Sequence, residues 1–149
     1  MKFKGSIIIT DPCYICLDED WDNLAGDCDM DLMSIGMKDS ICESTIYGDW
    51  SCTTFSCKKQ DPIEARKSYL TGCENPFEYG RFCADAGMVC VCYVKDLLIY
   101  NPKFFEECGQ WCYTLIPDFE GEVEYCVDDE EAFIIGKGNK NFFTCQTGL

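Results

Sequence analysis

Histidine is absent from all 149 positions of the chain. Imidazole is the usual general base beside a serine or cysteine nucleophile, and it is a common ligand of catalytic zinc. The composition therefore excludes Ser–His and Cys–His catalytic pairs and metal centres that depend on histidine. A metal ion in this protein would be bound by thiolates and carboxylates.

Positive charge is scarce as well. The chain has 12 basic and 27 acidic residues, and its formal net charge is −15. Positions 5–57 hold eleven acidic residues and one base, Lys38, whereas positions 118–131 hold eight acidic residues and no base. Affinity for nucleic-acid phosphates rests on Lys and Arg, so this charge disfavours direct binding to DNA or RNA. It favours attraction to a basic protein surface, with solubility alone as the alternative role.

Long apolar runs are also missing. No stretch approaches the length of a transmembrane helix, so we expect no membrane association. The N-terminal sequence MKFKGSIIITDP has an apolar run of three isoleucines, which is shorter than a secretory signal requires. We therefore expect a cytoplasmic protein whose 14 cysteines are metal ligands or buried thiols, with structural disulfides as the less favoured alternative.

The chain length and a hydrophobic fraction of 47% predict one folded domain over residues 1–149. Short runs rich in β-branched and aromatic residues alternate with Gly, Pro and Asp, which is typical of short strands joined by turns. The sequence predicts an α+β fold with seven to nine short, mainly antiparallel strands in a rolled sheet or open barrel. Two or three short helices complete this expectation.

Turn residues divide the chain into expected elements. A strand that begins after Gly5 should end at Asp11-Pro12, and an extended run should follow over 13–16. Helices are expected over 17–24 and after Pro62. Hairpins are expected for 41–47 with 50–57 and for 132–135 with 141–146, and an acidic loop is expected over 117–122. The glycine-rich stretch 136–140 lacks the phosphate-loop frame and is expected to be a hairpin turn.

Four stretches share a recognisable pattern: ITDPCYI (Ile9–Ile15), TIYGDWSCTTF (Thr45–Phe55), FCADAGMVCV (Phe82–Val91) and the ending GKGN…FFT…TGL (Gly136–Leu149). Together they resemble a family of small uncharacterised bacterial and phage proteins. The resemblance spans most of the chain and implies a mixed, mainly β domain in the cytoplasm of a bacterial host. It implies no reaction and no catalytic residues.

Small size, strong acidity and the lack of a catalytic constellation also resemble anti-CRISPR inhibitors, in kind and not by motif. This resemblance implies a non-enzymatic inhibitor that binds a basic surface of a host nuclease such as Cas9 and blocks its nucleic-acid engagement. Two alternatives stay open: a small ligand-binding protein with its site in the mouth of the β-structure, and an enzyme that acts through carboxylates.

Two groups of acidic residues are candidates for binding a basic partner. The first lies on the expected helix over 17–24, and the second alternates along the chain at a period of two, which places its members on one face of a strand. The alternative roles are a solvated helix face and an edge strand protected by charge. The candidate residues are Asp18, Glu19, Asp20 and Asp22 in the first group and Asp118, Glu120, Glu122 and Glu124 in the second.

The spacing of four cysteines predicts a structural zinc site. Cys13 and Cys16 have the spacing of a thiolate knuckle, and Cys108 and Cys112 are the nearest second pair. Buried free thiols are an equally favoured alternative. Redox catalysis is disfavoured, because a strand is expected after Cys13 and the acidic residues that follow would raise the pKa of its thiol.

Overall fold

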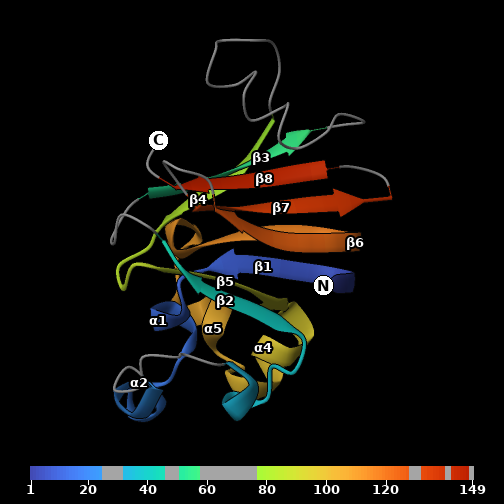
Figure 1. The fold of residues 1–149 in the computed structure, drawn as a ribbon. Helices are drawn as coiled ribbons and strands as arrows, with labels where there is room; N and C mark the ends of the chain where they lie inside the picture. Colours follow the sequence, from blue (N-terminus) through green and yellow to red (C-terminus); the bar gives the residue numbers. More distant parts are fainter. Residues whose placement is uncertain (25–31, 46–50, 58–76, 128–131, 140–141, 148–149) are drawn as a thin grey trace.

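The computed structural model describes residues 1–24, 32–45, 51–57, 77–127, 132–139 and 142–147. Its eight strands form one open sheet in the order β2-β5-β1-β6-β7-β8-β3-β4, and every neighbouring pair is antiparallel (Figure 1). This arrangement confirms the predicted fold class. The strands are β1 (Lys2–Thr10), β2 (Ser40–Ser44), β3 (Ser51–Cys57), β4 (Phe77–Cys83), β5 (Met88–Tyr93), β6 (Tyr113–Val127), β7 (Ala132–Gly138) and β8 (Phe142–Thr147).

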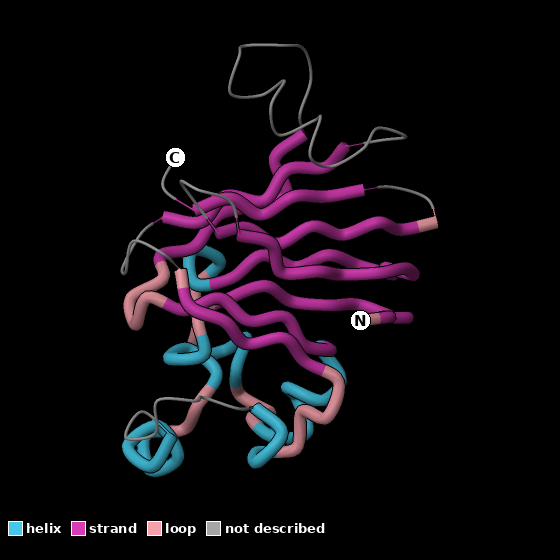
Figure 2. Tube along the Cα trace, viewed as in Figure 1, coloured by secondary structure: helices cyan, strands magenta, loops and turns pink. Residues whose placement is uncertain are grey.

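Most of the short helices lie next to β1, β5 and β2, at one end of the sheet, whereas the turn over 110–112 contacts β4 and β6 (Figure 2). The described residues contain more helical turns than the two or three that we expected, because several span only three or four residues. None of the described helices is long and apolar enough to cross a membrane. The helices are α1 (Pro12–Ile15), α2 (Asp18–Leu24), α4 (Val94–Tyr100) and α5 (Phe104–Glu107), with the 3₁₀ turns η1 (Leu32–Ile35) and η2 (Gln110–Cys112).

Strand β1 lies in the interior of the sheet, between β5 and β6. Its isoleucines Ile7, Ile8 and Ile9 are completely buried. Ile7 and Ile9 belong to the larger core cluster, whereas Ile8 points to the opposite face and packs with Leu97 of α4 and Phe104 of α5. An unbroken apolar run bounded by turn residues is typical of a strand that is covered on both faces, and the helices cover the second face here.

The sheet rolls around its larger core. Val91 of β5 and Phe82 of β4 are far apart in the strand order, yet both belong to one cluster with side chains of β1, β3, β6, β7 and β8. The roll brings Gly80 of β4 against Thr114 of β6. A Cβ atom at Gly80 would lie 3.2 Å from the Thr114 Oγ1 atom, so the absence of a side chain permits this close approach.

Two predicted connections are wrong. The segments 41–47 and 50–57 do not form a hairpin, because β2 pairs with β5 and β3 pairs with β4 and β8. The stretch 117–122 is no loop either. It forms the middle of the 15-residue strand β6, which pairs with both β1 and β7. The hairpin of β7 and β8 is confirmed, and the helix expected after Pro62 lies outside the described residues.

We predict that Gly121→Ala strongly destabilises the protein. A Cβ atom at Gly121 would lie 2.0 Å from the carbonyl oxygen of Lys137 and 2.7 Å from the Cα atom of Gly138, so the pairing of β6 with β7 must shift. We expect the free energy of unfolding in urea to fall by about 3 kcal/mol.

Gly109→Ala is the matched control for that experiment. There the three atoms nearest a Cβ atom all belong to the exposed side chain of Trp111, which can rotate away. We expect a change below about 1 kcal/mol for the control. Equal losses for both variants would contradict the packing of β6 on β7 described above.

Candidate functional site

The buried carboxylate of Asp11 connects three segments of the chain. Its Oδ1 atom accepts a hydrogen bond from the backbone N–H of Cys13 at 2.9 Å. Its Oδ2 atom accepts hydrogen bonds from the backbone N–H groups of Ala86 at 2.9 Å and Met88 at 3.2 Å. The end of β1, the start of α1 and the turn between β4 and β5 are therefore held by one side chain.

The sequence Asp11-Pro12 begins a helix, which corrects the extended run that we expected over 13–16. Asp11 is the N-cap residue of α1 and Pro12 is the first helical residue, where its missing N–H has no consequence. The helix ends at Ile15, and the N–H of Cys16 donates to the carbonyl oxygen of Pro12 at 3.0 Å. The acidic N-cap and the proline are the usual signals of a helix start.

Burial raises the pKa of Asp11 above its ordinary value, and the three backbone hydrogen bonds oppose this change. A carboxylate without solvent needs donors, and the N–H groups at the helix start and in the turn supply them. Three hydrogen bonds thus fix the position of the Asp11 side chain, and Asp11 in turn holds the surrounding segments in place.

Further hydrogen bonds strengthen these contacts and add the residue that follows β2. The Tyr14 hydroxyl donates a hydrogen bond to the carboxylate of Asp85. The carbonyl oxygen of Gly87 accepts hydrogen bonds from the Thr45 N–H at 2.8 Å and from the Thr45 hydroxyl at 3.1 Å. The ADAG stretch therefore contacts both DPCY and the start of TIYGDW, two other stretches that carry the resemblance.

The structure separates the four cysteines that were predicted to bind zinc. Cys13 lies in the first turn of α1, whereas Cys16 follows α1 and is buried in the smaller core cluster. The Cys108 thiol donates to the carbonyl oxygen of Tyr14 at 3.7 Å, and the neighbouring thiols of Cys108 and Cys112 shift each other's pKa. Only Cys108 and Cys112 are thus brought together as predicted.

A metal site is not assembled among the described residues. Within these ranges no three Cys, Asp or Glu side chains are grouped as ligands of one ion. A zinc site formed by Cys13, Cys16, Cys108 and Cys112 stays a prediction. Protein purified without chelator and analysed for zinc tests it.

The thiols of this region are held in their protonated form. Burial raises the pKa of Cys16 and that of Cys112 to about 11 each, and nearby acidic groups or thiolates add to the shift. The pKa of Cys13 is raised further by burial and by the adjacent carboxylate of Asp11, although its position at the start of a helix would favour a thiolate. These raised thiol pKa values agree with the prediction that redox catalysis is disfavoured. The expected strand, which was the other ground for that prediction, is replaced by the helix α1.

The first acidic group projects from α2. Asp18, Glu19 and Asp22 are exposed. Asp20 is half-buried and accepts a hydrogen bond from the Tyr100 hydroxyl at 2.5 Å, and the oxygen of Tyr100 accepts from the backbone N–H of Leu17 at 3.0 Å. These contacts fix α2 on α4, so its exposed carboxylates have a defined position.

Two exposed aromatic side chains were not singled out from the sequence. Trp111 is 64% exposed, and its ring stands edge-on to Tyr14 with 5.9 Å between ring centroids. Phe105 is 37% exposed and forms edge-to-face contacts with Phe104 and Tyr113. Glu106 and Glu107 of α5 lie next to Phe105 in the chain and are also exposed. Only the fold could reveal this exposure, because aromatic residues are usually buried.

The second acidic group lies on β6, and its geometry is confirmed in part. Glu120, Glu122 and Glu124 alternate along the strand on one face. Asp118 lies at an irregularity opposite Ser6, where its φ angle of 50° departs from the strand conformation and its N–H donates to the Ser6 hydroxyl.

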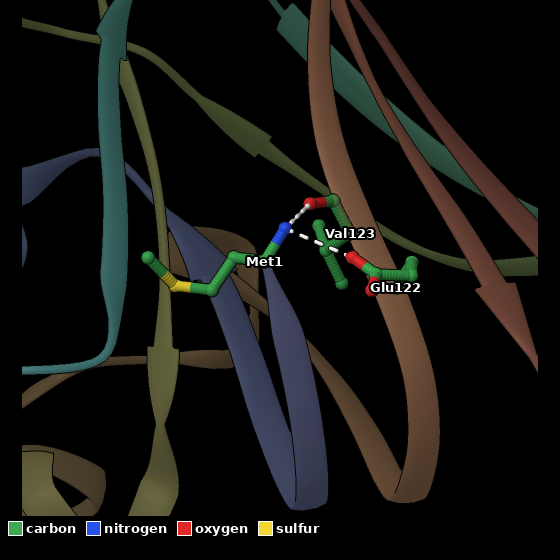
Figure 3. Close-up of polar contacts among 3 residues, drawn as sticks. All are labelled: Met1, Glu122 and Val123. Carbon is green, nitrogen blue, oxygen red and sulfur yellow. Dashed lines mark hydrogen bonds and ion pairs between the residues drawn. The ribbon is translucent and has the colours of Figure 1, made fainter.

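Lysines flank this acidic face, which the sequence did not indicate. Lys4 lies opposite Glu120, and Glu122 lies between Lys2 on β1 and Lys137 on β7. The N-terminal ammonium of Met1 pairs with the carboxylate of Glu122 at 3.1 Å and donates to the carbonyl oxygen of Val123 at 3.0 Å (Figure 3). The second acidic group is therefore locally compensated and does not form a purely negative stripe.

Comparisons with protein-family models, curated proteins and solved structures found no match for this chain. The resemblance to small bacterial and phage proteins therefore stays a prediction from the four sequence stretches.

We predict that Asp11→Ala destabilises the protein by about 2 kcal/mol or more. The substitution removes the cap of α1 and leaves the N–H groups of Cys13, Ala86 and Met88 without their acceptor, although it also removes a carboxylate that is costly to bury. Thermal and urea unfolding measure the change. Asp85→Asn is the control, since Asp85 is exposed, and it should cost less than about 1 kcal/mol. Similar losses in both variants would contradict the anchoring role of Asp11.

We also predict slow alkylation of Cys16 and Cys112. A thiol pKa of about 11 in place of about 9 leaves roughly one hundredth of the thiolate at pH 8, so iodoacetamide should react about 100-fold more slowly than with a free thiol. The rate should rise as the pH approaches 11. Mass spectrometry follows each site, with the exposed Cys83 as internal control. Labelling of either thiol as fast as that of Cys83 would contradict the description of these sites.

The same shifts predict how stability depends on pH. The unfolded chain releases these thiol protons near pH 9, whereas the folded chain keeps them to about pH 11. The stabilisation is therefore complete below pH 9 and is lost as the pH rises through 11.

Proposed function

We propose that this protein is a non-enzymatic acidic inhibitor that binds a basic surface of a host nucleic-acid-binding enzyme, a nuclease such as Cas9, and blocks its engagement with nucleic acid. A net charge of −15 supports attraction to a surface that is built to bind phosphates. The proposal assigns no catalytic residue.

The observation that carries this proposal is the exposed carboxylates of the short helices, together with exposed aromatic rings on α5 and η2. Interfaces gain most of their affinity from a few aromatic and Arg side chains, whereas surrounding charges steer the approach of the partner. We assign Trp111, which is 64% exposed, as the aromatic anchor. The exposed or half-buried acidic residues of the same segments are Asp18, Glu19, Asp20, Asp22, Asp85, Asp96, Glu106 and Glu107, and the basic ones are Lys95 and Lys103.

The acidic residues of β6 have a lesser part in this proposal. Glu120 and Glu122 face lysines on the neighbouring strands, which reduce the negative potential that a basic partner would meet. Asp118 and Glu124 are exposed but lie on the same strand. We therefore assign the docking surface to α2, α5 and Trp111.

The proposal predicts that the purified protein prevents guide-loaded Cas9 from shifting its target DNA in an electrophoretic assay, and that the inhibition weakens from about 50 to about 200 mM salt. The triple variant Asp18→Asn, Glu19→Gln, Asp22→Asn should weaken the inhibition about tenfold at low salt, because it removes steering charge. Trp111→Ala should weaken it by about tenfold or more at any salt concentration.

A triple variant on β6 is the matched control, since it removes the same charge from the other acidic group. Asp118→Asn, Glu120→Gln, Glu124→Gln should change the inhibition less than about threefold. The proposal is wrong in its choice of surface if the control loses inhibition and the α2 variant keeps it. It is wrong in its choice of partner if unmodified protein leaves DNA binding unchanged.

A further inference from the structure

Two adjoining hollows lie over β1, β6 and β7 near the N-terminal end of β1, whereas α1 follows its C-terminal end. The larger has a volume of about 490 Å³ and the smaller about 410 Å³. Lys4, Glu120 and Asn139 line both. These volumes lie in the range of sites that bind small molecules, which is about 300–1,000 Å³.

Six polar side chains form a grid at the larger hollow. One row runs from Lys2 through Glu122 to Lys137, as the strand register shows. The next row runs from Lys4 through Glu120, whose carbonyl oxygen accepts a hydrogen bond from the Asn139 N–H at 2.8 Å. Residues directly opposite each other in antiparallel strands project to the same face, so the lysines of β1 and β7 face one hollow.

This concentration of lysines is unusual in so acidic a chain. The described residues include seven basic side chains, and three of them line the larger hollow; the seven are Lys2, Lys4, Lys38, Arg81, Lys95, Lys103 and Lys137. None of the three forms an ion pair with a residue that the structure describes. The Glu122 carboxylate between two of them already pairs with the N-terminal ammonium.

The backbone beneath the grid is held in place by an aromatic residue. The hydroxyl of Tyr93, at the end of β5, accepts a hydrogen bond from the Lys4 N–H at 2.7 Å. The Tyr93 ring packs edge-on against Phe3, with 5.1 Å between ring centroids, and both residues line the hollow. The lysine side chains thus extend from a backbone that is fixed before any ligand binds.

We propose that this grid binds a small molecule with two or more anionic groups, such as phosphates or carboxylates. Lys2 and Lys4 are two residues apart on one strand, about 7 Å, and Lys2 and Lys137 are two strand spacings apart, about 10 Å. Ammonium groups at these separations match anionic groups several ångströms apart in one ligand. Glu120 and Asn139 offer hydrogen bonds to hydroxyl or amino groups of the same molecule.

The net charge of the whole protein helps to test this site. A chain of net charge −15 repels anions in general, so measurable affinity for a multivalent anion has to come from a local group of cations. The site does not depend on the inhibitor function proposed above, because it shares no residue with α2, α5 or Trp111.

Isothermal titration calorimetry with inorganic pyrophosphate and with citrate tests the proposal, with acetate as the monovalent control. We expect pyrophosphate, citrate or both to bind with a Kd below about 1 mM, and acetate not to bind. Binding of only one of the two identifies phosphate or carboxylate as the preferred group. Lys4→Gln and Lys137→Gln should each weaken binding about tenfold.

Lys38→Gln is the matched control, since Lys38 is an exposed lysine on the segment before β2, outside the hollow, and it should leave the Kd unchanged. All three positions are exposed, so the variants should unfold at the same temperature as the unmodified protein. Absence of binding for both multivalent anions overturns the proposal, as does a Kd that Lys4→Gln and Lys137→Gln leave unchanged.

Discussion

The described structure depends on one buried carboxylate. Asp11 accepts hydrogen bonds from the N–H groups of Cys13, Ala86 and Met88, and it thereby joins the end of β1 to α1 and to the turn between β4 and β5. β4 and β5 are consecutive in the chain, but they lie at the far edge and near the opposite edge of the sheet, so this turn spans the roll. A side chain that fixes this turn therefore also fixes how the open sheet curves over its core.

Charge is divided between two regions with different surroundings. The carboxylates of α2 and α5 are exposed, with few basic residues in these segments, and the ring of Trp111 in η2 is exposed as well. On β6, the carboxylates alternate with lysines of the adjoining strands. The same acidic composition thus produces an exposed acidic region, for which we propose a basic partner, and elsewhere a mixed surface with a hollow lined by lysines. The net charge alone does not distinguish the acidic residues of the helices from those of β6.

The sequence predicted the elements that depend on residues close together in the chain. It did not predict strand pairings and side-chain groupings that depend on distant segments. The isoleucine run of β1, the helix over Asp18–Leu24 and the period-two glutamates of β6 follow from local patterns, and the structure contains all three. The expected hairpin of 41–47 with 50–57 was wrong because β2 reaches β5 and β3 reaches β8, pairings that no turn signal encodes. The four cysteines were grouped by spacing alone, yet Cys16 belongs to the core. The lysines that flank the β6 glutamates lie on β1 and β7, and only the strand register shows that they are neighbours.

The account rests on Asp11 as a buried acceptor of backbone hydrogen bonds, and its titration tests this most directly. NMR of the side-chain carboxyl carbon, followed with the amide signals of Cys13, Ala86 and Met88 as the pH is lowered, measures the pKa of Asp11 and identifies its partners. The account predicts one shared transition at a pH above the ordinary Asp value of about 3.9, because burial outweighs the hydrogen bonds. A transition at or below that value, or amide signals that do not follow it, would contradict the account.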